Sequence, residues 1–93
     1  MKKLLLLSLF ACSLFAAEPQ KLKLFIKDGC PYCHKVLREM KHSMPTTDIG
    51  KNPADRDELE QTGGKAQVPC LFIDGKPLYE SDAIIEWLNT HEY

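Results

Sequence analysis

The stretch KLKLFIKDGCPYC, residues 21–33, predicts a strand that leads directly into a helix. Its first half alternates lysines with apolar residues, the pattern of a half-buried strand, and Phe25 gives the opposite face an apolar side chain. Asp28-Gly29 breaks the strand, and Pro31 has the fixed φ that suits the first position of a helix. We therefore expect Cys30 at the N-cap position, between a buried strand and a helix.

The rest of the chain continues an alternating α/β pattern, β-α-β-α-β-β-α overall. We expect a helix from Pro31 whose apolar face runs from Cys33 to Met44, followed by a short strand at 46–49. The next helix is expected to be capped by Asn52 and stopped by Gly63-Gly64. After it we expect a buried strand at 68–73, an Asp74-Gly75 hairpin turn, an edge strand at 77–79, and a last helix capped by Ser81 or Asp82.

Residues 1–17, MKKLLLLSLFACSLFAA, have the layout of a secretory signal peptide. The apolar run after the two lysines is shorter than the ~20 residues that a membrane-spanning helix needs. We expect cleavage after Ala16 or Ala17, which leaves residues 18–93 as the folded domain. Two alternatives stay open: Leu9-Phe10-Ala11-Cys12 resembles a lipoprotein cleavage box, and the segment can instead remain as an uncleaved membrane anchor. In each case we expect a periplasmic domain that meets the membrane only through this segment.

Charge identifies no macromolecular partner. Without Lys2 and Lys3, the 10 remaining basic residues stand against 13 acidic ones, a net charge of −3. No basic run suggests nucleic acid, and the acidic residues at 54–60 are expected to form a solvated helix face. We expect a monomer that binds no nucleic acid.

The cysteine count favours a reactive pair. After residues 1–17 the chain keeps Cys30, Cys33 and Cys70, an odd number that is unlike the even sets of disulfide-stapled exported domains. Zinc usually takes four ligands, and only His34 and the distant Cys70 are available to join the pair, so we expect no metal. A permanent disulfide that closes so short a loop gains little stability. Electron exchange therefore suits the pair best.

The two cysteines are predicted to differ in reactivity. The N–H groups of the first helical turn point toward the Cys30 sulfur, and together with the helix dipole they are expected to lower its pKa below the ~8.5 of a free thiol. Lys27 adds a positive charge nearby. Cys33 lies on the apolar face of the helix and is expected to be shielded. Cys30 is thus predicted to attack, and Cys33 to resolve.

At this point the residues resemble a known family. Cys30-Pro31-Tyr32-Cys33 is similar to the active site of dithiol glutaredoxins, and Lys27 stands where that family keeps a lysine. Gln67-Val68-Pro69 resembles the family's Thr-Val-Pro loop, whose proline is cis and faces the active cysteine, and residues 71–76 resemble its hairpin. The resemblance covers residues 21–89 and implies a thioredoxin fold with a four-stranded mixed sheet.

The resemblance also implies a glutathione site. The glutathione backbone is expected to pair with Val68, beside Lys27 and Tyr32, and its γ-glutamyl carboxylate is expected at the N-terminus of the last helix. The residues implied in binding are Lys27, Tyr32, Val68, Pro69, Glu80, Ser81 and Asp82.

The last helix departs from the glutaredoxin pattern. Tyr79-Glu80 stand where that family usually has two glycines. Residues 80–85, ESDAII, instead resemble the N-terminal domain of glutathione transferases, in which Glu-Ser holds the γ-glutamyl group. Because both families bind glutathione with this loop, the departure concerns the side-chain contacts more than the ligand.

The expected function is that of a glutathione-dependent thiol–disulfide oxidoreductase, which reduces or exchanges protein and glutathione mixed disulfides through Cys30 and Cys33. Reduction, oxidation and isomerisation all stay open as the net direction. The alternative is a non-catalytic module that holds glutathione or Cu(I), since soft thiolates favour Cu(I). Cys70 is read either as a small buried strand residue or as a third thiol able to trap a mixed disulfide.

Overall fold

A computed structural model describes residues 20–93 of the chain, and the predicted signal segment lies outside the described residues. Helices and strands follow one another in the predicted order: β1 (Leu22–Ile26), α2 (Pro31–Glu39), β2 (Thr46–Asp48), α3 (Pro53–Gly63), β3 (Cys70–Ile73), β4 (Lys76–Tyr79) and α4 (Ser81–Thr90). Within this part of the chain, each helix is too short or too polar to cross a membrane.

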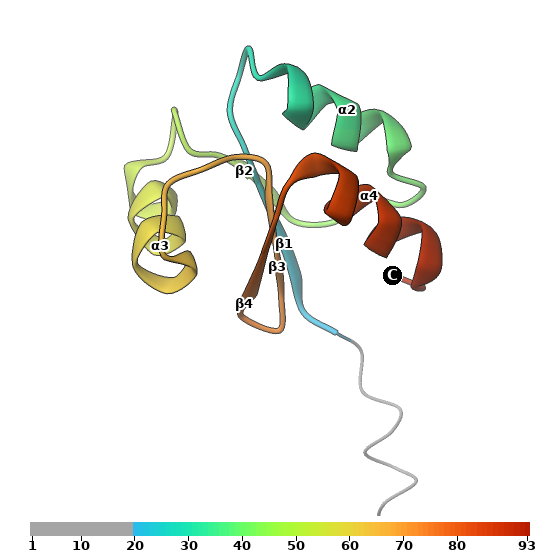
Figure 1. Cartoon of the computed structure of the whole chain (residues 1–93). Coiled ribbons are helices and arrows are strands. Elements are labelled where there is room, and N and C mark those ends of the chain that lie inside the picture. Colours follow the sequence, from blue (N-terminus) through green and yellow to red (C-terminus); the bar gives the residue numbers. More distant parts are fainter. Residues whose placement is uncertain (1–19) are drawn as a thin grey trace, which may run out of the picture.

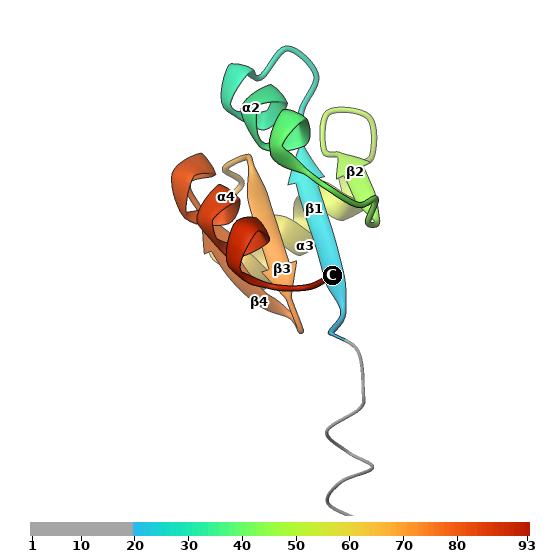
Figure 2. The same cartoon turned by 90° about the vertical axis from the view of Figure 1, so that its right-hand side faces the viewer.

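The four strands form one mixed sheet in the order β2-β1-β3-β4. Strand β1 pairs parallel with β2 and antiparallel with β3, and β4 forms the edge beside β3. Helices α2 and α4 cover one face of the sheet and α3 covers the other, as Figures 1 and 2 show from two directions. This is the four-stranded mixed sheet of the predicted thioredoxin fold.

Alternating side chains of the two central strands supply both halves of the core. On the side of α2 and α4, the buried cluster consists of Leu24, Val36, Leu71, Ile84 and Leu88. On the side of α3, it consists of Phe25, Ile49, Leu59, Cys70 and Phe72. The alternation predicted for β1 and the burial of β3 on both faces are thus confirmed.

Helix α2 ends five residues before the predicted apolar face does. Its last residue is Glu39, and Met40 already has an extended backbone with φ −70° and ψ 133°. The Tyr93 hydroxyl accepts the backbone N–H of Lys41 at 2.6 Å and also that of the next residue. Met40 and Met44 still pack against the core although neither residue is helical. The contact with Tyr93 holds this segment outside the helix, which the periodic pattern alone did not indicate.

Of the N-caps predicted for α3 and α4, the position of the first is confirmed and the second is wrong. Asn52 is the N-cap residue of α3, but its side chain donates to Thr47 Oγ1 and to the Asp48 carbonyl instead of capping the helix. Helix α4 begins at Ser81, so Ser81 is the first residue of the helix, and the N-cap position belongs to Glu80. Asp82 likewise lies in the first turn and not at the cap.

The predicted turns are confirmed where glycine or a positive φ was required. Gly64 ends α3 with a φ of 102°, and Asp74 and Gly75 have φ of 52° and 83°, as a two-residue hairpin turn of type I′ needs. Strand β3 starts at Cys70, two residues later than predicted, because Pro69 has no N–H to give to a ladder.

Candidate active site

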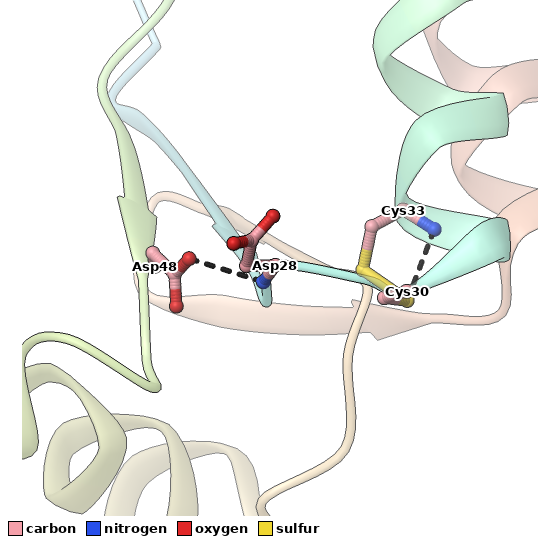
Figure 3. Close-up of a disulfide and its surroundings, with 4 residues drawn as sticks. All are labelled: Asp28, Cys30, Cys33 and Asp48. Atoms are coloured by element: carbon pink, nitrogen blue, oxygen red, sulfur yellow. Dashed lines mark hydrogen bonds between the residues drawn. A yellow bond between two sulfur atoms is a disulfide. The ribbon is translucent and has the colours of Figure 1, made fainter.

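The cysteine pair lies at the junction of β1 and α2. Cys30 is the N-cap residue of α2, as predicted, and Cys33 lies in the first turn. Their sulfurs are joined in a disulfide, with the Cα atoms 5.2 Å apart, as Figure 3 shows. The Cys33 N–H donates to Cys30 Sγ at 3.1 Å. The helix N-terminus therefore points a backbone donor at the Cys30 sulfur.

The two cysteines differ in exposure. Cys33 is 1 % exposed, whereas Cys30 is only half-buried. Tyr32 stands between them in the chain and is 64 % exposed. An incoming sulfur therefore reaches Cys30 first, and Cys33 is placed to attack Cys30 from within.

A tight turn connects β1 to Cys30. The Cys30 N–H donates to the Lys27 carbonyl at 3.2 Å, and Gly29 has the φ of 78° that the third position of a type II turn requires. The Asp48 carboxylate, at the end of β2, accepts the N–H of Asp28 at 3.0 Å, as Figure 3 shows. In the sequence, the signal for a role of Asp48 is its position near the end of a predicted strand, β2, which pairs with β1.

Six of the seven residues predicted to bind glutathione line one groove. This groove has a volume of about 340 Å³ and is lined by Tyr32, Gln67, Val68, Pro69, Glu80, Ser81 and Asp82. The first turn of α2, the loop before β3 and the first turn of α4 thus meet there. The Val68–Pro69 peptide is cis, as the resemblance implied.

Lys27, the seventh predicted residue, lies in a neighbouring hollow of about 440 Å³. Val68 lines both the groove and this hollow, so the two are adjacent. Arg56 of α3 lines the hollow too. The acidic composition of residues 54–60 predicts a solvated face and gives no sign that Arg56 lines this hollow. The structure instead places two cationic side chains together beside the groove.

The α4 end of the groove is acidic. Lys35 of α2 donates to Asp82 Oδ1 at 2.9 Å, and this hydrogen bond raises the pKa of Lys35. Gln67 Nε2 donates to Glu80 Oε2 at 3.4 Å. Glu80 has a φ of 77°, a conformation that L-residues rarely adopt. The groove and hollow together therefore have carboxylates at one end and cations at the other.

Cys70 belongs to the core. Its side chain is fully buried in the cluster under α3, and it carries a free thiol. Burial raises the pKa of this thiol to about 11. This favours the interpretation of Cys70 as a packed strand residue over a third reactive thiol.

Among residues 20–93, His, Cys, Asp and Glu side chains do not gather in groups of three or more that suit a metal ion. The expectation that the cysteine pair holds no metal stays a prediction.

Comparison with known proteins agrees with this geometry. The family model described as Glutaredoxin matches residues 22–78, more than half of the chain. The chain belongs to the glutaredoxin family. It is 33 % identical to glutaredoxin 3 of Escherichia coli (strain K12) over 57 residues, which cover 58 % of this chain and 69 % of that relative.

Solved glutaredoxin structures share the fold. The crystal structure of oxidized glutaredoxin 2 from Chlamydomonas reinhardtii superposes with a TM-score of 0.59 and 25 % identity, over 75 % of this chain and 72 % of that one. The holo form of glutaredoxin C1 from Populus tremula x tremuloides gives a TM-score of 0.54 at 23 % identity, over 73 % of each chain, a likeness of fold alone. With its Cys30–Cys33 pair, this glutaredoxin is a thiol–disulfide oxidoreductase.

Proposed function

We propose that this glutaredoxin reduces or exchanges glutathione mixed disulfides, with glutathione as co-substrate and Cys30 as the attacking sulfur. The observation that carries the proposal is the groove that contains six of the predicted glutathione residues. Tyr32 lines this groove and lies in the same helical turn as the cysteine pair. Neither cysteine lines the groove, but Tyr32 brings it to the first turn of α2, so a ligand in the groove is proposed to lie near the Cys30 sulfur.

The charges around the groove suit a tripeptide with two carboxylates and one ammonium group. The first N–H groups of α4 have no acceptor within the helix and suit the γ-glutamyl carboxylate. The carboxylates of Glu80 and Asp82 suit the ammonium group beside it. Lys27 and Arg56, in the adjacent hollow, suit the glycine carboxylate. Val68 lies between these two ends, where its peptide groups are proposed to pair with the glutathione backbone.

The proposed reaction starts with the Cys30 thiolate. It attacks the glutathione sulfur of a mixed disulfide, the bond to the substrate sulfur breaks, and the substrate leaves as a thiolate that takes up a proton. A second glutathione thiolate then attacks the glutathione sulfur on Cys30 and releases glutathione disulfide. Alternatively, Cys33 attacks the Cys30 sulfur, which releases glutathione and leaves the Cys30–Cys33 disulfide.

We further propose that residues 18–93 act in the periplasm after residues 1–17 direct export. Glutaredoxin potentials of roughly −200 to −230 mV suit reduction by cytosolic glutathione, whereas the bacterial periplasm is kept oxidising. Reduction there needs exported glutathione or a reductant that passes electrons across the membrane; otherwise the pair donates or isomerises disulfides. Mass spectrometry of the N-terminus tests the export proposal, because a chain that keeps residues 1–17 unmodified contradicts cleavage and supports the anchor.

Trapping tests the glutathione proposal. The reduced Cys33→Ser variant, incubated with glutathione disulfide, is expected to gain one glutathionyl group on Cys30, located by peptide mass. Cystine, which lacks the γ-glutamyl and glycyl groups, serves as the control and is expected to react several-fold more slowly. Equal rates with the two disulfides would contradict recognition of glutathione.

Turnover of a glutathionylated peptide tests the division of roles. We expect the Cys30→Ser variant to be inactive and the Cys33→Ser variant to keep partial activity, because glutathione can replace Cys33 as the resolving thiol. Activity in the Cys30→Ser variant would contradict the proposed mechanism. Copper that stays bound through purification, together with no turnover by the unaltered protein, would favour the carrier function instead.

A further inference from the structure

A continuous path of hydrogen bonds leads from β2 to the redox sulfur. Asp48 Oδ2 accepts the N–H of the peptide group between Lys27 and Asp28 at 3.0 Å. The carbonyl of that same peptide group accepts the Cys30 N–H at 3.2 Å. Cys30 Sγ then accepts the Cys33 N–H at 3.1 Å. Figure 3 shows the first and last of these contacts on either side of the turn.

The first contact fixes the orientation of one peptide plane. A carboxylate that accepts an N–H makes a strong, charge-assisted hydrogen bond. Because the N–H and C=O of the Lys27–Asp28 peptide point in opposite directions, holding its N–H toward β2 turns its C=O toward the Cys30 N–H. The conformation of this turn then determines the position of Cys30 at the start of α2. We propose that Asp48 is a positioning residue that sets the reactivity of Cys30 by holding this peptide plane.

The second oxygen of Asp48 holds Gly50, a residue that lines the hollow beside Lys27. Asp48 Oδ1 accepts the Gly50 N–H at 2.7 Å. A Cβ built on Gly50 would lie 3.5 Å from Lys27 Cε, so the Lys27 side chain passes directly over this glycine. One carboxylate therefore holds both the turn at residues 27–30, the redox turn, and the loop beneath Lys27. This inference rests on the proposed role of Cys30 as the attacking sulfur.

When Asp48 is replaced, positioning and simple electrostatics predict opposite changes in the Cys30 pKa, so a measurement of this pKa distinguishes them. A nearby negative charge disfavours a thiolate, so removing the Asp48 charge by itself would lower the Cys30 pKa. Loss of the turn geometry would instead weaken the contact from the helix N-terminus and raise that pKa. The other charged or titratable groups around the turn and hollow are unchanged in Asp48 variants; they are Lys27, Asp28, His34 and Arg56.

The experiment measures the pH dependence of Cys30 alkylation in the reduced full chain, resolved by peptide mass, together with turnover of a glutathionylated peptide. We expect Asp48→Ala to raise the Cys30 pKa by about half a unit and to lower kcat/KM by about tenfold. Asp48→Asn keeps one acceptor oxygen, so we expect a smaller rise of the Cys30 pKa and a smaller loss of kcat/KM. Asp74→Asn is the matched control, since Asp74 Oδ1 likewise accepts a backbone N–H, that of Lys21 at 2.8 Å, far from the redox turn. It is expected to change neither readout.

A rescue variant separates positioning from loss of fold. Proline is favoured at the second position of a type II turn, which is position 28, and it pre-sets this turn without an N–H. Asp28→Pro introduced into the Asp48→Ala background is therefore expected to restore most of the Cys30 reactivity, whereas Asp28→Ala in that background, which removes the same carboxylate without pre-setting the turn, is expected to restore less. A lowered pKa in both Asp48 variants, or no rescue by Asp28→Pro, would overturn the proposal. An unaltered chain whose Cys30 ionises like a free thiol would instead refute the proposed function itself.

Discussion

Helices α2 and α4 start side by side, yet their first turns are used differently. Residues from both first turns line the same groove, and Lys35 of α2 contacts Asp82 of α4. At the start of α2, the sulfur of Cys30 accepts a helix N–H. At the start of α4, the described residues provide no side-chain cap, and Glu80 has a strained φ of 77°.

The difference shows how one physical feature supports two tasks. Every helix begins with N–H groups that lack acceptors within the helix. Where the cap residue is a cysteine, these donors stabilise a thiolate and so produce a nucleophile. Where no side chain caps them, the same donors remain available to an anionic ligand. The proposed nucleophile and the proposed ligand site thus lie next to each other because two helix N-termini do.

Replacing Cys30 separates the chemistry of its sulfur from its role as a cap. Both Cys30→Ser and Cys30→Ala are expected to lose activity by on the order of 10³-fold or more, since neither side chain is a thiolate. Serine is a good N-cap and alanine is a poor one, so under reducing conditions the alanine variant should be less stable by about 1 kcal/mol. Urea unfolding of the two reduced variants measures this difference. Equal stabilities would show that the side chain at position 30 does not cap α2.

Cys70 provides a sulfur without a helix N-terminus. Its pKa of about 11, against an ordinary 9.0, makes the thiolate about 100-fold scarcer at a given pH. We expect native Cys70 to resist alkylation under conditions in which Cys30 reacts, as peptide mass mapping would show. Alkylation of Cys70 at the rate of Cys30 would contradict this.

The raised pKa of Cys70 also predicts that the stability of the fold falls at high pH. The pKa of Cys70 is higher in the folded chain than in the unfolded chain, so the folded chain binds the thiol proton more tightly. The stability that this difference contributes is lost as pH rises from about 9 to about 11. The Cys70→Ala variant should lack this part of the decline in urea unfolding experiments across that range.

Glycine at position 80 tests the strain at the start of α4. Glu80→Gly relieves the positive φ and is expected to stabilise the fold by about 1 kcal/mol. Glu80→Ala removes the same carboxylate but keeps the strain, so it should bring no such gain. Thermal or urea unfolding compares the two, and any effect on KM for a glutathionylated substrate should be common to both. A stabilised alanine variant would mean that the carboxylate, not the backbone, is the unfavourable element.

The smallest expected effect concerns the contact between the two helices. Asp82→Asn should lower the Lys35 pKa toward its ordinary value, because a hydrogen bond to the carboxylate raises it. Lys23 is the internal control: hydrogen bonds to Glu58 and Asp55 raise its pKa, and the substitution should leave them intact. Titration of the lysine side chains by NMR measures both. A Lys35 pKa that does not move would show that the contact is absent in solution.

The sequence predicted those features that depend on neighbouring residues. The cap at Cys30, the stop at Gly64 and the Asp74-Gly75 turn were correct because φ preferences and capping act over a few residues. The groove residues were found through a resemblance to known motifs. Their gathering in one groove follows from the fold, but their contacts with glutathione remain proposals.

The misses share a different cause. Helix α2 ends at Glu39 because Tyr93 holds the segment that follows it. Arg56 was assigned to a solvated face, yet it shares a hollow with Lys27. Asp48 received no role, because its partner Asp28 lies 20 residues away. Each of these depends on which distant segments the sheet brings together, and local patterns do not contain that information.

The sequence by itself determined the order of strands and helices, the reactive pair and its place at a helix N-terminus, since periodicity, turn preference and cap chemistry are local. Only the tertiary structure decided which side chains surround that pair. Pairing β1 with β2 brings Asp48 to the redox turn, and packing α2 beside α4 on one face of the sheet closes the groove. The physical reason is that side chains far apart in the sequence meet only when burial of apolar surface on both faces of the sheet fixes the strands and helices around it.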